Sequence, residues 1–490
     1  MTLRKNQDDP GIFAFTMIDL TVFEKYPFLS VLKSLSFKDE PIYLVGGCVR
    51  DLLLGHDPED FDLAVAGNPK RLAEKLAARL NGSTFKLGKN KTIVYRVMAG
   101  THLLDVAQLV GDGIESDLRH RDFTVNAMAL DMNGVHLIDP CNGVADIRNH
   151  RIKMVSKNAF INDPLRMLRA YRFAACLNFA IDDGTTDAIG RHAGQITASA
   201  VERIKTEFFK LIATPISLPH LMAMQKSGLL FAIFPELGDM AGCLQNRHHE
   251  FDVMEHTWRA YQVLEQALNG QLSGLPPEIK QVISQWSATE KILFKCAMLF
   301  HDVGKPRTRT VTESGDVHFF EHEAVGAKMA RDMCLRLKCA NTETGFIESV
   351  ITHHLRPLML FIAYQNGTTL TRKGITRFFL ACGPLTPFVL MHVLADISGK
   401  NRGGFAELDP CLSAFVTRLF NQYHESFQPV QRQPRLVTGQ DLMNLFGLHP
   451  SPLFKVILLD VEEARLSGDI HTREDGLKLA ESLVQQASGR

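Results

Sequence analysis

Hydrophobic periodicity changes once along this chain of 490 residues, and that change limits the folds that it can adopt. Before about residue 150, short apolar runs typical of strands alternate with helical patterns and are separated by glycine or proline. Farther along, apolar side chains recur at helical spacing in Asn162–Phe179, Val201–Ala213 and Leu218–Phe231. The sequence therefore predicts an α+β protein, with a small mixed sheet in the first part and only helices after it.

The expected elements of the first part follow from apolar runs and their breaks. A run that ends at Gly46-Gly47 predicts one strand, and the next apolar residues begin a helix. An amphipathic pattern behind a proline predicts a second helix. Strands are expected at Ile42–Val45, Phe61–Val65, Thr92–Met98 and Leu103–Leu109, and helices at Val49–Leu54 and Pro69–Leu80.

Composition narrows the class of protein. Lys and Arg together number 54, and so do Asp and Glu, so a nucleic-acid surface would have to be a local basic patch. The nine cysteines show no CxxC pairing, which is typical of reduced thiols in a cytosolic protein. Met1–Asp19 lacks a signal-peptide pattern, and no run approaches the roughly 18 apolar residues that span a bilayer. We therefore expect a cytoplasmic protein without a membrane segment.

Two aspartates alternate with apolar residues in the second expected strand. Successive side chains of a strand point to opposite faces, so the carboxylates of Asp60 and Asp62 converge on one face and Phe61 lies on the other. Like charges held together are costly unless a cation lies between them, and hard divalent cations prefer oxygen ligands. Asp105, in another expected strand, is either a third catalytic carboxylate or a solvent-facing residue. For the aspartate pair, the structural alternative is an acidic turn at Pro58–Asp60 that caps the strand.

Paired glycines precede these acids, between the first strand and the first helix. Glycine lets the backbone approach a ligand closely, and a helix N-terminus favours anions. Paired glycines also end strands in many folds, so Gly46 and Gly47 alone indicate little. Together with the acids they form an ordered motif.

That motif, Gly-Gly-x-Val-Arg-Asp at residues 46–51 followed by Asp-Phe-Asp at 60–62, resembles the bacterial tRNA nucleotidyltransferase and poly(A) polymerase family. The head domain of that family has a DNA polymerase beta-like fold. The resemblance implies that Asp60 and Asp62 bind two Mg²⁺ ions, which stabilise the attacking and leaving oxygens of nucleotidyl transfer. It also implies that three residues bind the triphosphate, namely Gly46, Gly47 and Arg50.

Residues 119–127, Arg-His-Arg-Asp-Phe-Thr-Val-Asn-Ala, are similar to the stretch that links head and neck in this family. Arg119 and Arg121 are candidate phosphate contacts, because a guanidinium forms bidentate bonds to phosphate oxygens. Asn126 is a candidate for a hydrogen bond to ribose or backbone, and Asp122 has either a structural or a catalytic role. We assign all of them to nucleotide binding, with a salt-bridged helix start as the structural alternative.

Asp163 and Arg166 lie three residues apart at the start of an expected helix, so they are neighbours on one face. The structural interpretation is an ordinary helical ion pair. The functional interpretation is base selection without a template: a carboxylate accepts from the exocyclic amine of cytosine or adenine, and a guanidinium donates to the ring acceptor. Uracil and guanine present a carbonyl there and would be rejected. The pair predicts CTP and ATP as substrates.

The family pattern at this helix is Glu-Asp-x-x-Arg, and this chain has Asn162 in place of the glutamate. The base-reading pair is retained, whereas an orienting carboxylate is missing. Arg169, Arg172 and the segment Val201–Glu207 also match the neck of the family, which makes both arginines nucleotide-binding candidates. The resemblance runs in order through residues 41–240.

A second candidate metal site lies downstream. His256, His301-Asp302 and Asp396 have the order and approximate spacing of an HD-domain phosphohydrolase, and an apolar helix, Ile292–Phe300, precedes the His-Asp pair. Neighbouring His and Asp can bind one cation when both face a cavity. The resemblance implies a divalent transition metal and hydrolysis of phosphate monoesters or 2′,3′-cyclic phosphates. Further ligands or phosphate-binding residues are expected at His322, His353 and His354, and Gln245–His256 resembles the HD domain of some tRNA nucleotidyltransferases.

The connection Gln108–Leu118 is shorter than the loop that complete CCA-adding relatives carry after an Ala-Thr-Phe-Arg stretch, and this chain reads Ala-Gln-Leu-Val from Ala107. In the family, loss of that loop accompanies addition of CC alone. The segment Phe85–Lys91 is an alternative mobile loop.

The sequence thus predicts an enzyme that adds C and/or A to the tRNA 3′ end and whose HD domain hydrolyses phosphate esters at RNA ends. Poly(A) polymerase and an HD phosphohydrolase with an inactive head are the alternatives, and the oligomeric state stays open. The expected segments are an N-terminal extension (1–25), a nucleotidyltransferase head (26–150), a helical neck (151–240), an HD domain (241–403) and a helical tail (404–490). The basic residues expected to track RNA phosphates are Arg148, Arg151, Lys153, Arg169, Arg172, Lys205 and Lys210.

Overall fold

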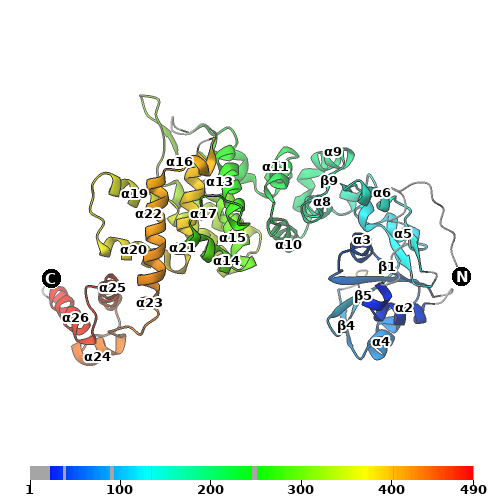
Figure 1. Ribbon diagram of the computed structural model, residues 1–490, viewed down its shortest axis with the longest axis horizontal. Helices are drawn as coiled ribbons and strands as arrows, with labels where there is room; N and C mark the ends of the chain where they lie inside the picture. Colours follow the sequence, from blue (N-terminus) through cyan, green and yellow to red (C-terminus); the bar gives the residue numbers. More distant parts are fainter. Residues whose placement is uncertain are drawn as a thin grey trace. The chain divides into compact units, whose positions relative to one another are not determined.

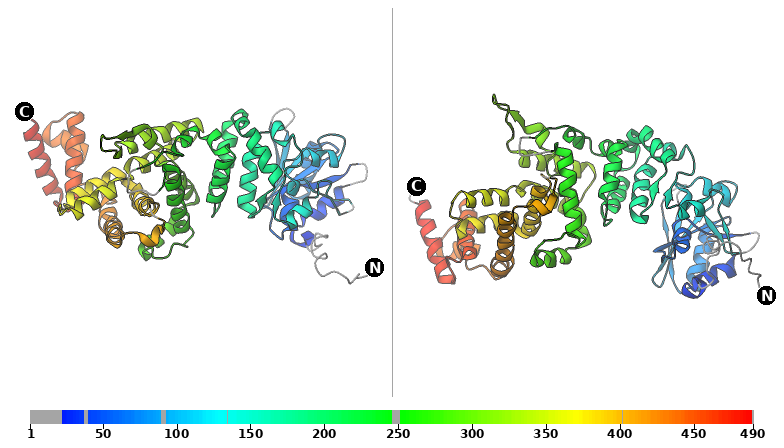
Figure 2. Two further views of the ribbon diagram at one scale, coloured as in Figure 1. Left: turned by 90° about the horizontal axis from the view of Figure 1, so that it is seen from above. Right: turned by 45° about the horizontal axis from the view of Figure 1, so that its top comes forward.

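The structure is a computed structural model that describes residues 22–36, 40–88, 93–133, 135–245, 251–400 and 402–488. The chain forms two compact units: unit 1 comprises residues 1–211 and 223–233, and unit 2 comprises residues 212–222 and 234–490. Unit 1 contains the large sheet, drawn in blue and cyan in Figures 1 and 2, and unit 2 is mostly helical. The two units do not test the expected division into five segments, which stays a prediction.

Seven strands of unit 1 form one mixed sheet in the order β3-β4-β5-β2-β1-β6-β7. Strands β2 and β5 are parallel, and the other neighbouring pairs are antiparallel. The expected strands are confirmed, although Thr92 lies outside the described residues, and β3, β6 and β7 are additional. The strands are β1 (Ile42–Val45), β2 (Asp60–Val65), β3 (Ser83–Leu87), β4 (Val94–Ala99), β5 (His102–Gln108), β6 (Ala129–Asp131) and β7 (His136–Ile138).

Short helices connect and cover these strands. The two expected helices are confirmed, and α4 begins where the Asn68 side chain accepts hydrogen bonds from two backbone N–H groups ahead of Pro69. The first helix begins inside the expected N-terminal extension. The helices of this part are α1 (Val22–Lys25), α2 (Phe28–Leu35), α3 (Gly47–Leu53), α4 (Pro69–Arg79), α5 (Ile114–Arg119) and α6 (Gly143–Arg148).

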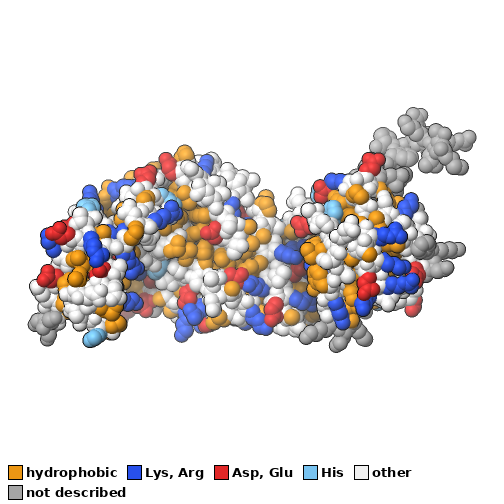
Figure 3. Space-filling view, turned by 90° about the horizontal axis from the view of Figure 1, so that it is seen from below, with side chains coloured by type: hydrophobic (Ala, Val, Ile, Leu, Met, Phe, Trp, Pro, Cys, Tyr) orange, Lys and Arg blue, Asp and Glu red, His pale blue; other side chains and the backbone are white. Residues whose placement is uncertain are grey.

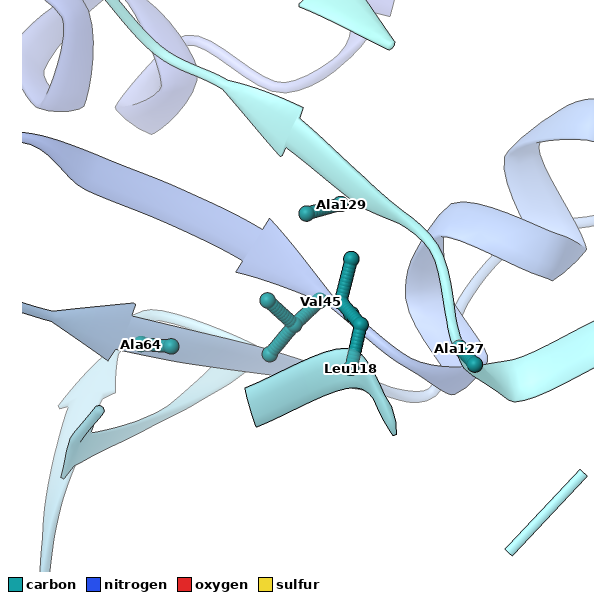
Figure 4. Packing of buried hydrophobic residues seen from close by; sticks show 5 residues of the cluster. All are labelled: Val45, Ala64, Leu118, Ala127 and Ala129. Carbon is teal, nitrogen blue, oxygen red and sulfur yellow. The ribbon is translucent and has the colours of Figure 1, made fainter. Parts of the chain in front are cut away.

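A small apolar cluster fixes α5 against the sheet. Figure 4 shows Val45 of β1 and Leu118 of α5 with three alanines around them, and all five residues are buried. Alanine side chains from β2 and the β6 segment leave room for the larger Val45 and Leu118, so the helix packs closely on the strands. The packing places the residues that follow α5 beside the ends of β1 and β2.

The neck is helical with two breaks and one small sheet. The expected helix Asn162–Phe179 is interrupted at Pro164, which lacks a backbone N–H, and Leu218–Phe231 is interrupted at Gly228, whose φ is 76°. The prediction of helices alone after residue 150 is wrong here, because β8 (Arg151–Ile152) and β9 (Ala180–Ile181) form a parallel pair. The neck helices are α7 (Ala159–Asn162), α8 (Leu165–Leu177), α9 (Asp183–His192), α10 (Val201–Ile212), α11 (Leu218–Lys226) and α12 (Leu229–Ile233).

In its described residues, unit 2 consists of packed helices and one short hairpin, β10 (Arg309–Val311) with β11 (Val317–Phe319), which is a second exception to the all-helical prediction. A π-helix, Gln422–Phe427, joins α22 to α23. The helices are α13 (Val253–Leu268), α14 (Pro277–Gln285), α15 (Ala288–Phe300), α16 (Lys305–Thr308), α17 (His322–Arg336), α18 (Asn341–His353), α19 (Arg356–Gln365), α20 (Arg372–Cys382), α21 (Thr386–Ser398), α22 (Pro410–Asn421), α23 (Gln428–Gln431), α24 (Gly439–Phe446), α25 (Pro452–Ser467) and α26 (Arg473–Ser488).

One helical stretch of unit 2 is more apolar than expected. Arg372–Ser398 is, by length and composition, able to cross a membrane, which corrects the expectation that no run is long enough. Within it, 72% of the most apolar window is buried inside the protein, and a buried core helix passes the same test. The stretch is α20 and α21, and the buried side chains of α21 are part of the core of unit 2.

A buried ion pair ties the start of α11 to two core helices of unit 2. The ammonium of Lys295 on α15 lies 2.7 Å from Glu265 on α13 and donates to the backbone carbonyls of Ile212 and Thr214. The Glu265 carboxylate also accepts hydrogen bonds from the N–H and hydroxyl of Ser217. Both charged groups are nearly inaccessible, so each depends on the other for compensation.

Replacement of Lys295 by methionine is expected to lower the free energy of unfolding of unit 2 by about 3 kcal/mol, because it leaves the Glu265 carboxylate buried without its cation. Denaturant titration of the full chain measures this loss. Lys280→Met, at an exposed position of α14, is the control and should change stability by less than about 0.5 kcal/mol. Equal effects of the two substitutions would contradict the interpretation.

Candidate functional site

The three candidate carboxylates of the head share one face of the sheet. Asp62 on β2 is paired in register with Asp105 on β5, and Asp60 lies two residues earlier on β2. Paired residues of neighbouring strands point to the same side, so the structure brings the three together. Phe61, between the two aspartates of β2, is fully buried on the other side.

Gly46 lies directly beside these carboxylates. Its φ is 78°, and a Cβ atom there would lie 2.6 Å from Nη1 of Arg121 and 3.6 Å from Oδ2 of Asp62. Only a residue without a side chain allows the Arg121 guanidinium to come so close to Gly46. An ion pair of 3.1 Å with Asp117 on α5 holds Arg121 in this position.

The electrostatics of Asp62 favour a bound cation. Burial raises the pKa of Asp62, the Arg121 guanidinium lowers it, and the carboxylates of Asp105 and Asp60 raise it again, so that it lies above its ordinary value. A divalent cation among these oxygens would lower that pKa and relieve the repulsion. The carboxylates therefore fit the hard cation expected from the sequence.

Asp105 has a second partner on its other side. Both of its oxygens accept hydrogen bonds from Arg96 on β4, at 2.7 Å from Nε and 2.6 Å from Nη2. Strand register explains the contact, because Arg96 is the residue paired with Asp105 across β4 and β5. Sequence reasoning missed Arg96, which only the pairing of the strands identifies.

The other predicted phosphate contacts lie in different surroundings. Arg119 is exposed on α5 and pairs with Glu115 of the same helix at 3.8 Å. Arg50 is buried, donates to Asn126 at 2.6 Å and pairs with the neighbouring Asp51. The structure thus places Arg121 beside the carboxylates, whereas Arg50 lies in a buried network behind them and Arg119 on the helix surface.

That network continues from Asn126 into the neck. Asn126 donates to Asp122, and the other oxygen of Asp122 accepts two hydrogen bonds from Arg169 on α8, at 2.9 and 2.7 Å. Arg169 also lies 3.4 Å from Glu207 on α10, which pairs with Arg172 at 2.5 Å. The predicted nucleotide contacts Asn126, Asp122, Arg169 and Arg172 are therefore joined to each other.

Phe173 lies at the centre of these charges and was missed as a site residue. The guanidinium carbons of Arg172, Arg169 and Arg50 lie 3.9, 5.1 and 5.3 Å from its ring centroid. Burial by itself would raise the pKa of Asp122, but Arg169 and the hydrogen bonds from Asn126 and the Phe123 N–H hold it below the ordinary 3.8. For Asp122 the geometry favours the structural role among the two left open by the sequence.

Asp163 lies at the break between α7 and α8 and Arg166 in the first turn of α8, and each is engaged by another group. Asp163 accepts a hydrogen bond from Arg203 of α10 at 2.8 Å. Arg166 donates to the backbone carbonyls of His120 and Arg121, at 2.7 and 3.1 Å. Arg166 is thus joined directly to the backbone of the residue that lies beside Asp62.

Several side chains of unit 2 meet at a second buried centre. Nε2 of His256 on α13 lies 2.8 Å from Asp396 on α21, and Nε2 of His301 lies 3.1 Å from Asp302. His322, at the start of α17, and His354, directly after the end of α18, reach the same centre. Among the described residues, two groups of three place their donor atoms within 4.8 Å of one another: His256 with His301 and Asp396, and Asp302 with His322 and His354.

Three histidines of this centre are oriented by backbone carbonyls that precede them in the chain. Nδ1 of His301, His322 and His354 each lies 2.7–2.8 Å from the carbonyl oxygen three residues earlier. With Nδ1 held by the carbonyl, Nε2 is the ring nitrogen left for the centre, and in the neutral form its lone pair can bind a metal. Buried polar atoms without a hydrogen-bond partner include Nε2 of His322 and Oδ1 of Asp302. The donor set therefore fits a divalent metal.

Charge at this centre is balanced inside the protein. Burial raises the pKa of Asp302, but His301 and Lys305 hold it well below its ordinary value, and the Lys305 ammonium lies 2.7 Å from the carboxylate. Burial lowers the pKa of His354 to about 3, with His301 and His322 acting in the same direction. Ionised carboxylates and a neutral His354 are the states that coordinate metal.

Two histidines differ from the sequence-based expectation. His353 does not belong to either donor group, although its neighbour His354 does. His392 on α21 was missed: it is fully buried, neither ring nitrogen has a hydrogen-bond partner, and its ring centroid lies 5.0 Å from that of His301. Its position four residues before Asp396 places both on one face of α21 and could have indicated it. Residues 246–250, including part of the predicted HD stretch, lie outside the described residues.

The basic residues expected to track RNA are partly committed to other contacts. Arg151 pairs with Asp146 at 3.0 Å, and Arg169 and Arg172 belong to the network around Phe173. On the face shown in Figure 3, Lys and Arg side chains are interspersed with Asp and Glu. This distribution agrees with the equal numbers of the two charges in the sequence.

Comparison with known proteins identifies three family matches along the chain. Residues 42–153 match the Poly A polymerase head domain, residues 178–240 the probable RNA and SrmB-binding site of polymerase A, and residues 253–376 the HD domain. The matched ranges contain the carboxylates of the sheet and most of the buried histidine centre.

Full-length similarity extends to curated proteins and to a solved structure. The A-adding tRNA nucleotidyltransferase of Deinococcus radiodurans is 30% identical over 91% of this chain and 96% of its own length. The CC-adding tRNA nucleotidyltransferase of Thermus thermophilus is 31% identical over 88% of this chain and 91% of its own length. The Thermotoga maritima CCA-adding enzyme, solved with tRNA, shares the fold with a TM-score of 0.61 at 18% identity, covering 96% of each chain.

Asp122→Asn is expected to destabilise unit 1 by about 2 kcal/mol at neutral pH, because Arg169 keeps only the longer contact to Glu207. The folded pKa of Asp122 is lowered, so its contribution is present above the ordinary 3.8 and is lost as pH falls through the folded value. Chemical unfolding at several pH values should therefore show the gap between variant and wild type closing in acid. A gap that does not change with pH, or an equal one for the exposed Asp112→Asn, would contradict this role.

Proposed function

This chain belongs to the tRNA nucleotidyltransferase family, and we propose that it adds C and/or A nucleotides to the 3′ end of tRNA without a nucleic-acid template. The single observation that carries the proposal is the row of Asp60, Asp62 and Asp105 on one face of the sheet, beside Gly46. Poly(A) synthesis is the nearest alternative, because it uses closely similar motifs.

The proposed reaction needs negative charge to be stabilised at the transferring phosphoryl group. Mg²⁺ bound by Asp60 and Asp62 would supply that stabilisation and a more nucleophilic 3′-oxygen. The backbone at Gly46 and the guanidinium of Arg121 line the same place, where they can bind the triphosphate. The buried network around Phe173 supports this arrangement, and its charged and polar members are Arg50, Asn126, Asp122, Arg169 and Arg172.

Selection of the base is proposed for Asp163 and Arg166. Asp163 would accept from the exocyclic amine of cytosine or adenine, once that amine replaces the Arg203 guanidinium that now donates to it. Arg166, joined to the backbone at Arg121, would donate to the ring acceptor. This arrangement supports CTP and ATP as substrates and rejects UTP and GTP.

We further propose that addition is partial, with CC as the favoured product. Strand β5 ends at Gln108 and α5 begins at Ile114, so the connection between them is short. The two curated relatives named above are an A-adding and a CC-adding enzyme, whereas the Thermotoga maritima neighbour is a CCA-adding enzyme. Of the alternative loop Phe85–Lys91, the part up to Leu87 belongs to β3, and residues 89–92 lie outside the described residues.

A second activity is proposed for the buried centre of unit 2. The two donor groups support two divalent transition metals, one held by His256, His301 and Asp396 and the other by Asp302, His322 and His354. Such metals supply an activated water for phosphate-ester hydrolysis. The ammonium of the buried Lys305 contacts Asp302 and Gln245, and there it can bind a phosphate that enters the centre. An HD phosphohydrolase with an inactive head is disfavoured by the intact carboxylates of β2 and β5.

The purified full chain should extend tRNAs that lack CCA or CA when it is given CTP, but not when it is given UTP or GTP, and extension with ATP of a tRNA that lacks only the final A would contradict partial addition of CC. Product sizes show how many nucleotides are added. Asp60→Ala should reduce incorporation by about 1,000-fold or more, because it removes a metal ligand, while His354→Ala retains it. Incorporation that persists in Asp60→Ala refutes the catalytic assignment, and a long A-tail on unrelated RNA favours the poly(A) polymerase alternative.

Measurement of the bound metal distinguishes the roles of His353 and His354 at the end of α18. After reconstitution with Ni²⁺, His354→Ala should lose one ion per chain relative to wild type and reduce hydrolysis of 2′,3′-cyclic phosphates by about tenfold or more. His353→Ala is the matched control and should keep both. If the two variants bind equal amounts of metal, the second donor group does not hold an ion.

A further inference from the structure

The contact between Arg96 and Asp105 has a consequence for the first site. We propose that Arg96 is a positioning residue that withholds Asp105 from the cation site of the nucleotide-free protein, so that Asp60 and Asp62 alone are available to the first cation. The inference rests on the proposed nucleotidyl transfer and adds a residue that none of the motifs contains.

The Arg96 guanidinium engages both carboxylate oxygens of Asp105. Its Oδ1 accepts from Nε of Arg96 at 2.7 Å, and its Oδ2 accepts from Nη2 at 2.6 Å. A bidentate guanidinium–carboxylate pair is among the strongest side-chain contacts and fixes the carboxylate plane. Asp105 is largely covered, with its side chain 18% exposed, so water competes weakly for these oxygens.

The arrangement of donor atoms in the head agrees with the proposal that Asp60 and Asp62 bind the first cation without Asp105. Asp105 is the register partner of Asp62, a position from which three carboxylates can close around one ion. Among the described residues, however, the groups of three donors within 4.8 Å of one another both lie in unit 2, and the head carboxylates are not among them. Arg96 contributes a positive charge on the far side of Asp105, where it competes with a cation for the same oxygens.

Nucleotide entry changes this competition. A guanidinium binds phosphate oxygens in the same bidentate manner as a carboxylate, so an incoming triphosphate offers Arg96 a second anionic partner. The Arg96 side chain is 30% exposed and can reach solvent from the sheet face. Release of Asp105 would then complete the cation site only when a substrate is present.

Binding of Mn²⁺ to the nucleotide-free full chain, followed by electron paramagnetic resonance, tests the proposal. Asp60→Asn measured in parallel identifies the fraction bound in the head, because unit 2 has its own donors. Arg96→Met should bind the head ion roughly tenfold more tightly than wild type, since it frees Asp105 and removes a competing charge. Arg96→Lys keeps the charge without the bidentate contact and should give an intermediate affinity.

The double variant Arg96→Met/Asp105→Asn distinguishes action through Asp105 from a general electrostatic effect. It should lose the gain in affinity that Arg96→Met shows alone. Arg71→Met, an exposed arginine of α4 that lies 4.0 Å from Glu40, is the matched control and should bind like wild type. An Arg96→Met head affinity within about twofold of wild type, or a gain that survives in the double variant, overturns the proposal.

Failure of this inference is distinguishable from failure of the proposed function. Metal binding is measured without RNA or nucleotide, and nucleotide addition by the wild-type chain is measured separately. A chain that adds no nucleotide overturns the proposed function whatever Arg96 does. If Arg96→Met does not fold, the Arg96→Lys affinity decides: a value equal to wild type refutes the role of the bidentate contact.

Discussion

Repulsion among carboxylates on one face of a sheet is the constraint on which the structure of the first site depends. Strand register places Asp60, Asp62 and Asp105 together, and their charges must be balanced by cations. Two guanidinium groups provide part of that balance from opposite sides, Arg121 behind Gly46 and Arg96 across β4 and β5. The glycine, the packing of α5 and the order of the strands are all needed to bring these groups within reach.

The same principle extends into the neck in a different form. There the charges neutralise each other: Asp122 and Glu207 are shared among Arg169 and Arg172, around the ring of Phe173. A buried pair of this kind contributes little net stability, but removal of one member is costly. The network therefore fixes α8 relative to the segment that carries Arg121, and so relates base selection to the carboxylate face.

Sequence patterns predicted the elements with a clear period and the residues within one strand. The alternation of apolar residues around Asp60 and Asp62 was sufficient to predict that both carboxylates point to the same face, because both positions lie in the same strand. Arg96 could not be found in this way, since its partner is defined by pairing between strands. His392 lies in a helix that is apolar on all sides, so hydrophobic periodicity does not distinguish it, and only its spacing of four residues from Asp396 could have indicated it.

Other differences follow from local chemistry. The break at Pro164 could have been predicted, because proline cannot donate the backbone hydrogen bond that a continuous helix requires. We expected Arg169 to contact RNA phosphates because a sequence does not show which side chain pairs with an arginine on a helix. The short pair β8–β9 joins residues far apart in the chain and has too few residues for a pattern.

The histidine centre of unit 2 has a consequence for the order of folding. His256 and Asp396, which are 2.8 Å apart, are separated by 140 positions in the chain, and their neighbours come from three further helix ends. Contacts of such long range close late, because the intervening chain must first be ordered. The rings of His301, His322 and His354 are already aimed by the carbonyl three residues earlier in the chain, so we expect an ion to find the donors only after the helices have packed. This order is the reverse of that in a zinc finger, where the ion directs the fold.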